Sequence, residues 1–131
     1  MTIRLLVADD HEIVRDGLRM TFENTRVRIV AEAVDGQHAF ELLQQHEVDV
    51  ALIDISMPRA DGFQFLELVR QADIDVRALM HSVHDGSEYL RRCQKLGAKG
   101  FLLKGQEKTV LLAAVSAVHN GNEFWNGPSV H

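Results

Sequence analysis

Short runs of aliphatic and β-branched residues alternate along the chain with longer segments in which apolar residues recur every three or four positions. The short runs are typical of buried strands, and the longer segments are typical of helices with one apolar face. The predicted strands cover residues 3–8, 27–33, 48–53, 76–80 and 99–103. A predicted helix follows each strand, so the pattern indicates five consecutive strand–helix units.

Two of these strands are apolar at almost every position. Residues 5–8 read Leu-Leu-Val-Ala and residues 50–53 read Val-Ala-Leu-Ile, which favours central strands of a parallel sheet covered by helices on both faces. The strand at 27–33 contains Arg28 and Glu32, so we expect it at an edge of the sheet. The predicted fold is a doubly wound α/β sheet.

Acidic residues precede three of the predicted helices. Asp-Gly pairs stand at 35–36 and 61–62, before the second and third helices. Asp85, with Glu88 three residues later, has the spacing of a capping box at the start of the fourth helix. We therefore expect side-chain caps at these three helix starts.

Length and composition limit the class of protein. With 131 residues, 46% hydrophobic and 25% charged, the chain fits one folded domain and not a disordered, fibrous or disulfide-rich class. Residues 1–120 are predicted to form the domain, and the polar residues 121–131 to begin a linker. Cys93, the only cysteine, is expected to be a small buried thiol. No apolar run approaches the roughly 18 residues of a membrane span, so we expect a cytoplasmic protein without a membrane partner.

Polar residues follow four of the five predicted strands, at the ends that a parallel sheet brings to one edge. They are Asp9 and Asp10 after the first strand, Asp54 after the third, Ser82 after the fourth and Lys104 after the fifth. Three neighbouring carboxylates repel one another unless a cation lies between them, and oxygen ligands favour Mg²⁺ or Mn²⁺ over zinc. The ammonium group of Lys104 could balance a carboxylate or a bound phosphoryl oxygen. The sequence thus predicts a divalent-metal site at this edge.

These residues, taken in order, resemble the receiver domain of two-component response regulators. The matching segments are Leu-Leu-Val-Ala-Asp-Asp at 5–10, Asp-Ile-Ser-Met-Pro-Arg-Ala-Asp-Gly at 54–62, Ser82, and Gly-Phe-Leu-Leu-Lys at 100–104. The resemblance covers essentially the whole chain. It implies a flavodoxin-like fold with five parallel strands in the order 2-1-3-4-5. In this order the strand order reverses between the first and third strands, so the paired acids and Asp54 lie on the two sides of that point.

Receiver domains carry a phosphoryl group on an aspartate, and the resemblance assigns this role to Asp54. It implies that Asp10 and Asp54 bind Mg²⁺ directly, together with the backbone carbonyl of Ser56. Asp9 would assist through a water molecule. The site would therefore combine a phosphoacceptor with a metal-binding pocket.

Further positions take their roles from the same resemblance. Ser82 and Lys104 would hold phosphoryl oxygens, and Phe101 occupies the aromatic switch position. Phosphorylation would draw the Ser82 hydroxyl inward and leave room for Phe101 to follow, which changes the face made by the fourth helix, fifth strand and fifth helix. Ser56 and His84 flank the path of an attacking water molecule, so we expect them to set the lifetime of the acyl phosphate.

Three segments resemble the NarL/FixJ class of response regulators, whose output domain is of the LuxR type. They are Ala-Asp-Asp-His at 8–11, Val-Arg-Asp-Gly-Leu at 14–18 and the ending at 114–130. In that class the ending leads to a linker and a DNA-binding helix-turn-helix domain, for which no residues remain here. The resemblance implies the receiver half of a transcription regulator or a stand-alone relative.

The implied partner is a sensor histidine kinase. The choice of kinase would be set by surface residues around the first helix, which are Glu12, Ile13, Arg15, Asp16 and Arg19. The chain would not be an enzyme, beyond assisting its own phosphorylation and dephosphorylation. A homodimer would use either the fourth helix, fifth strand and fifth helix, or the first and fifth helices. Because the net charge is −5, we expect DNA contact only through an output domain outside this chain.

Several residues depart from the usual receiver pattern and leave a second interpretation open. Gly105 stands where many receivers have proline, Val83 could crowd the approach to the phosphoacceptor, and His81 replaces an apolar residue. The alternative is a receiver-like interaction domain that is not phosphorylated. We expect His11, His81 and His84 to be ordinary hydrogen-bonded or solvated histidines, because a carboxylate site prefers harder metal ligands.

Two other classes lack residues that they need. A phosphatase of the haloacid dehalogenase type requires a second acid two residues after Asp54, where Ser56 stands. A nucleotide-binding module would carry a glycine-rich phosphate loop after the first strand, and none follows it.

Overall fold

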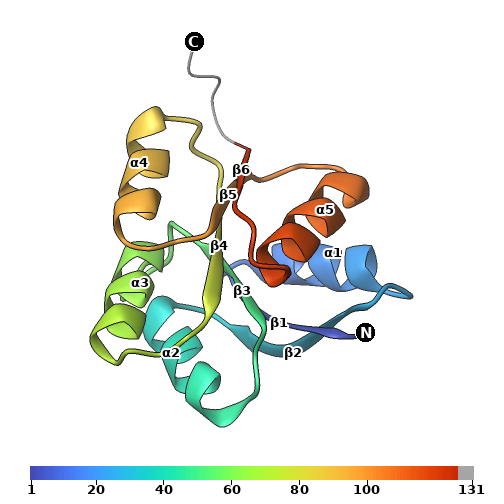
Figure 1. Ribbon diagram of the computed structural model, residues 1–131, viewed down its shortest axis with the longest axis horizontal. Coiled ribbons are helices and arrows are strands. Elements are labelled where there is room, and N and C mark those ends of the chain that lie inside the picture. The colour runs from blue at the N-terminus through green and yellow to red at the C-terminus, as the bar shows by residue number, and fades with distance from the viewer. Residues whose placement is uncertain (127–131) are drawn as a thin grey trace.

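The computed structural model describes residues 1–126 and contains one parallel sheet between two layers of helices (Figure 1). The strands are β1 (Ile3–Ala8), β2 (Val27–Ala33), β3 (Val50–Asp54), β4 (Arg77–Ser82), β5 (Gly100–Leu103) and β6 (Phe124–Asn126). The helices are α1 (Glu12–Phe22), α2 (Gly36–Gln45), α3 (Gly62–Gln71), α4 (Ser87–Lys95) and α5 (Lys108–His119). Strands and helices alternate as far as α5, as the hydrophobic pattern predicts.

The strand order is β2-β1-β3-β4-β5-β6, and all neighbouring pairs are parallel. The first five strands follow the predicted order, and β2 lies at an edge as expected. The prediction of a five-stranded sheet is wrong by one strand, because β6 pairs with β5.

The extra strand lies in the stretch that the sequence analysis assigned to the start of a linker. Phe124 pairs with Gly100, and the Phe124 N–H donates to the Lys99 carbonyl oxygen over 3.1 Å. Three residues are too few to show the alternation that identifies a strand in a sequence. Trp125 packs against the apolar core. Residues 127–131, the remainder of the predicted linker start, lie outside the described residues.

Each face of the sheet has its own apolar core. Figure 1 shows α1 and α5 on one side and α2, α3 and α4 on the other. The core under α1 and α5 includes Leu5, Leu18, Leu52, Leu102 and Val115. The core under α2, α3 and α4 includes Leu6, Ile53, Phe65, Cys93 and Phe101. The helices therefore cover both faces, and the carboxyl ends of the strands remain as the edge where loops carry polar side chains.

Two of the three predicted helix caps are present. At α2 and α3, Asp35 and Asp61 each accept a hydrogen bond from the backbone N–H three residues later, at 2.8 and 2.9 Å. The cap predicted at α4 is wrong, because this helix begins at Ser87 with Gly86 as its N-cap and no described side chain caps it. Asp85 lies one position before the N-cap, so its side chain is not placed to cap the helix.

Two further expectations concern the burial of Cys93 and the presence of a membrane-spanning helix. Cys93 is fully buried, and burial raises the pKa of its thiol to about 12, as expected for a small buried thiol. Within residues 1–126, none of the helices is both long enough and apolar enough to cross a membrane.

The pairing of β6 with β5 depends on the absence of a side chain at Gly100. A Cβ atom there would lie 2.6 Å from the Phe124 carbonyl oxygen and 2.6 Å from Leu79 Cδ1. Gly100→Ala must therefore displace backbone or core, and we expect it to lower the free energy of unfolding by roughly 1–3 kcal/mol in urea denaturation.

Gly17→Ala is the matched control for this substitution. Gly17 lies within α1, and a Cβ atom there would meet nothing within 4 Å. Alanine favours the helix at such a position, so we expect the free energy of unfolding to rise by roughly 0.5–1 kcal/mol. Equal stability of Gly100→Ala and wild type would contradict the described packing of β6.

Candidate functional site

Asp9, Asp54 and Lys104 stand at the carboxyl ends of β1, β3 and β5. Side chains two positions apart on a strand point to the same face of a sheet. The residues two positions before these three all belong to the core under α1 and α5. The three polar side chains therefore leave the sheet toward the same side, although they come from distant parts of the sequence.

The ammonium group of Lys104 lies between two buried carboxylates. Its Nζ donates a hydrogen bond to Asp9 Oδ2 over 2.7 Å and forms an ion pair with Asp54 Oδ2 at 3.2 Å. Asp9 is 1% exposed and Asp54 is 3% exposed, so water screens their mutual repulsion poorly. One positive charge cannot neutralise both carboxylates, and Asp10 adds a third acid to the cluster.

The pKa values show which carboxylate bears the remaining repulsion. Burial, followed by the negative charge of Asp9, raises the pKa of Asp54 to about 6. Burial alone would also raise the pKa of Asp9, but hydrogen bonds from Lys104 and from the His11 N–H outweigh burial, and the pKa of Asp9 is lowered. Asp54 is therefore the group that a further cation would stabilise.

Two carboxylate oxygens of the cluster, Asp54 Oδ2 and Asp10 Oδ1, are buried and accept no hydrogen bond from the described residues. The contact of Lys104 with the first of these oxygens is an ion pair without hydrogen-bond geometry. Asp9, Asp10, His11 and Asp54 each offer one ligand atom, and these atoms lie within 4.8 Å of one another. Buried oxygens without donors, at this spacing, fit a hard divalent cation.

Ser56 and His11 lie beside the acids. The Ser56 N–H donates a hydrogen bond to Asp54 Oδ1 over 3.2 Å, whereas the metal contact expected for its carbonyl oxygen stays a prediction. His11 Nδ1 lies 3.2 Å from Asp9 Oδ1 and 3.3 Å from Asp10 Oδ1. The sequence prediction left His11 out of the cluster, although the position of His11 directly after the paired acids indicated that its ring could lie beside them.

Arg15 is a second residue whose contact with the site the sequence analysis missed. Its Nη1 donates to the backbone carbonyl oxygen of Asp9 over 2.6 Å, and its Nε lies 3.2 Å from Glu32 Oε1 on β2. Arg19, one turn later on α1, also binds Glu32, with Nε 2.6 Å from Oε2. Only 15% of the Arg15 side chain is exposed, so it anchors the loop that carries Asp9 and presents little charge to a partner.

The Ser82 hydroxyl is held by the loop that follows β4. It accepts a hydrogen bond from the His84 N–H over 2.9 Å and donates to the His84 carbonyl oxygen over 3.3 Å. Phe101 is fully buried in the core under α2, α3 and α4. The ring at the expected switch position therefore lies inside in this structure, and its movement on phosphorylation stays a prediction.

Three departures from the receiver pattern have structural consequences. Gly105 has φ +90°, a left-handed conformation that proline cannot adopt. Val83 is 67% exposed, so it lies at the surface and does not crowd Asp54. His81 stands opposite Asp54 in the pairing of β3 with β4. Burial, followed by the positive charge of Lys104, lowers the pKa of His81 to about 4, so its ring is neutral at pH 7.

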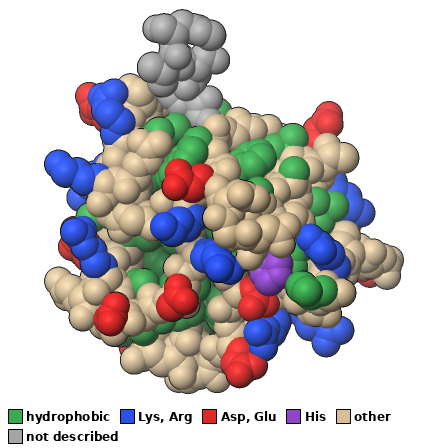
Figure 2. All heavy atoms as spheres, viewed as in Figure 1, with side chains coloured by type: hydrophobic (Ala, Val, Ile, Leu, Met, Phe, Trp, Pro, Cys, Tyr) green, Lys and Arg blue, Asp and Glu red, His purple; other side chains and the backbone are tan. Residues whose placement is uncertain are grey.

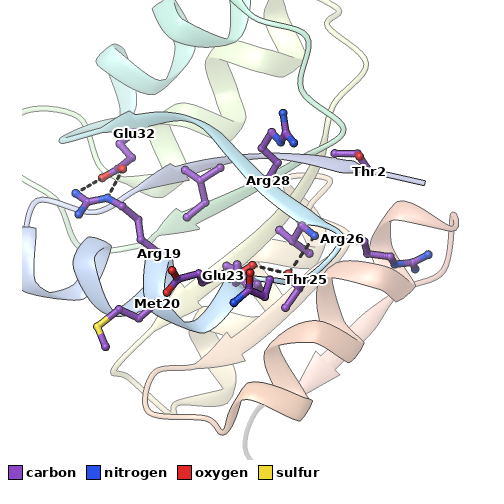
Figure 3. A pocket seen from close by; sticks show the side chains of 12 residues that line it. Thr2, Arg19, Met20, Glu23, Thr25, Arg26, Arg28 and Glu32 are labelled. Atoms are coloured by element: carbon purple, nitrogen blue, oxygen red, sulfur yellow. Dashed lines mark hydrogen bonds and ion pairs between the residues drawn. The ribbon is translucent and has the colours of Figure 1, made fainter.

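Two hollows in the surface differ in their relation to this cluster. One of about 430 Å³ borders it, and its lining includes Asp10 and Ser56. A larger hollow of about 550 Å³ lies where α1 ends and β2 begins (Figure 3). Figure 3 shows Arg19 bound to Glu32 among its lining side chains. None of the predicted site residues lines the larger hollow, so the acidic cluster is the candidate site.

Ionised Asp54 should destabilise the folded protein when no divalent cation is present. Its pKa of about 6 lies above the ordinary value of 3.8, so stability is lost as the pH rises through 6. We expect Asp54→Asn to exceed wild type in unfolding free energy by roughly 1–3 kcal/mol above that pH. The difference should shrink as the pH falls toward 3.8, as urea denaturation in a chelating buffer would show.

Mg²⁺ provides the control for this prediction. An added cation should stabilise wild type more than Asp54→Asn and so narrow the difference between them. A difference between the two proteins that stays constant across this pH range would show that Asp54 carries no uncompensated repulsion.

The chain is similar to known proteins over nearly its full length. The profile of the response regulator receiver domain family matches residues 5–116. The transcriptional regulatory protein DegU of Brevibacillus brevis is 33% identical over 130 residues, which are 98% of this chain and 55% of DegU. The probable transcriptional regulatory protein NarL of Mycobacterium tuberculosis is 38% identical over 122 residues, which are 92% of this chain and 56% of NarL. The chain thus spans a little over half the length of these relatives.

A solved structure shares the fold described above. The crystal structure of a LuxR-family two-component response regulator from Aurantimonas sp. SI85-9A1 matches with a TM-score of 0.89 at 30% identity. The match covers 98% of this chain and 91% of that one. The strand order, the acidic cluster and these similarities together show that the chain belongs to the response regulator receiver domain family, as a receiver domain of the NarL/LuxR type.

Proposed function

We propose that the chain accepts a phosphoryl group on Asp54 from the phosphohistidine of a sensor histidine kinase. The state of the Asp54 carboxylate carries this proposal, because it is 3% exposed and its Oδ2 accepts no hydrogen bond from the described residues. This oxygen keeps lone pairs free for attack, and Lys104 stands beside it to bind an incoming phosphate. The exposed position of Val83 weakens the alternative of a receiver-like domain that is not phosphorylated.

Transfer replaces one bond to phosphorus with another. An oxygen of Asp54 attacks the phosphorus atom in line, and the bond between phosphorus and the histidine nitrogen breaks. The electron pair of the broken bond stays on the kinase imidazole. Lys104 then exchanges its ion pair with Asp54 for a phosphoryl oxygen and keeps its hydrogen bond to Asp9. The Ser82 hydroxyl donates to a second phosphoryl oxygen.

The acidic cluster fits Mg²⁺, with Mn²⁺ as a substitute. Asp10, Asp54 and the backbone carbonyl of Ser56 would hold the ion, and Asp9 would contribute through water. The buried Asp10 Oδ1, which accepts no hydrogen bond from the described residues, supports this assignment. A bound ion would offset negative charge on the phosphoryl oxygens.

The lifetime of the acyl phosphate in this proposal depends on how water reaches it. Ser56 and His84 are both exposed, and they stand in the loops that follow β3 and β4. They flank the phosphorylated residue without forming the bond to phosphorus, so they tune hydrolysis. The protein assists its own phosphorylation and dephosphorylation and acts as an enzyme on no other substrate.

The proposed output is regulation of transcription, with this domain as the switch of a longer protein. DegU and NarL are named as transcriptional regulators, and this chain covers 55% and 56% of them. Figure 2 shows acidic and basic side chains interspersed on one face, and the net charge is −5. DNA binding is therefore assigned to an output domain outside these residues. Phosphorylation would change a homodimer contact through α4, β5 and α5, or through α1 and α5, in the cytoplasm.

Acetyl phosphate with Mg²⁺ tests the phosphoacceptor directly. We expect intact-mass spectrometry to show one added phosphoryl group on wild type, none on Asp54→Asn, and little on wild type with excess chelator. Asp61→Asn is the matched control, since Asp61 caps α3 and lines the adjacent hollow without belonging to the cluster. It should be modified like wild type. An unchanged yield in Asp54→Asn, or in the presence of chelator, would refute the proposal.

A further inference from the structure

Three rings and a guanidinium group form a continuous stack beside the acidic cluster. The His84 ring lies 4.8 Å from the Tyr89 ring, centroid to centroid, and the two planes differ by 7°. Tyr89 in turn lies 6.1 Å from Phe63, with planes 16° apart. The Arg92 guanidinium lies 4.0 Å from the centre of the Phe63 ring. The stack thus joins the loop after β4 to the first turns of α4 and α3.

One end of this stack is tied to the Ser82 hydroxyl. The His84 backbone donates to Ser82 Oγ and accepts from it, at 2.9 and 3.3 Å. A hydroxyl has a single hydrogen to donate. Ser82 therefore cannot donate to the His84 carbonyl and to a phosphoryl oxygen on Asp54 at the same time. Phosphorylation and the His84 backbone compete for one proton.

The aromatic residue at the expected switch position lies away from the surface in this structure. Phe101 is 0% exposed and packs in the core under α2, α3 and α4. The stack at His84, by contrast, begins at the hydroxyl that phosphorylation recruits and ends on α4.

We propose that Tyr89 is a positioning residue for the Ser82 hydroxyl. Its ring holds His84, and the His84 backbone keeps the hydroxyl engaged with the loop until a phosphoryl oxygen competes for it. Loss of that hydrogen bond shifts His84 against Tyr89 and so moves the first turn of α4. This inference rests on the proposed phosphorylation of Asp54 and adds the route by which that event reaches α4.

Tyr89 is the only tyrosine in the chain, so it supplies its own spectroscopic probe. Protein labelled with 3-fluorotyrosine should give one ¹⁹F resonance. Beryllofluoride with Mg²⁺ mimics the phosphoryl group, and its binding to wild type should shift this resonance. In Ser82→Ala most of the shift should be lost, because the hydroxyl no longer links Asp54 to His84. Asp54→Asn should show no shift.

Variants of Tyr89 test the positioning role by a second readout. Tyr89→Leu removes the ring that holds His84, so the Ser82 hydroxyl is released at lower cost and beryllofluoride should bind about three- to tenfold more tightly in calorimetric titrations. Tyr89→Phe keeps the ring, and its affinity should match wild type. A merely structural role for Tyr89 would weaken binding in Tyr89→Leu or leave it unchanged.

The outcomes separate this inference from the proposed function. If beryllofluoride and acetyl phosphate both fail to modify Asp54, the proposed function fails. If they bind or react while the Tyr89 resonance stays in place, or shifts equally in wild type and Ser82→Ala, only the inference about Tyr89 is overturned. A shift that depends on Ser82, together with tighter binding in Tyr89→Leu alone, supports both.

Discussion

The position of one ammonium group, between two buried carboxylates, determines how the rest of the site is arranged. Lys104 hydrogen-bonds Asp9 but forms only an ion pair with Asp54, so the two acids are compensated unequally. The pKa of Asp9 is lowered, and the pKa of Asp54 is raised to about 6 by burial and by the charge of Asp9. A cation on the acid side relieves this imbalance, and Lys104 stands on the other side of Asp54, where it can meet an incoming phosphate. The proposed chemistry follows from that unequal compensation.

Most of the fold could be predicted because its signals are local and repeated. Most positions of the first five strands are apolar, and such runs alternating with amphipathic segments allow few arrangements other than a doubly wound parallel sheet. That topology places the carboxyl ends of the strands at one edge of the sheet. The sequence alone therefore predicts that Asp9, Asp54 and Lys104 lie near one another. The caps at Asp35 and Asp61 could also be predicted locally, because each is a hydrogen bond between residues three positions apart.

The remaining features depend on tertiary contacts that leave little trace in the sequence. The three residues of β6 are held by pairing with β5, at a close approach that Gly100 permits because it has no side chain. The fourth helix begins at Ser87, after the position that a cap at Asp85 requires, and the loop before it is bound to Ser82 and stacked on Tyr89. Arg15 reaches the Asp9 carbonyl only because α1 packs beside β1 and β2. Such side-chain contacts across elements have no periodicity, and their residues are equally common at exposed positions.

The most direct test of the unequal compensation is the number of protons released when Mg²⁺ binds. Calorimetric titrations in two buffers with different ionisation enthalpies measure this number. If Asp54 has a pKa of about 6 without metal, Mg²⁺ should release about half a proton near pH 6 and almost none near pH 8. The release near pH 6 should disappear in Asp54→Asn. Mg²⁺ binding without proton release near pH 6, or the same release in Asp54→Asn, would contradict the account.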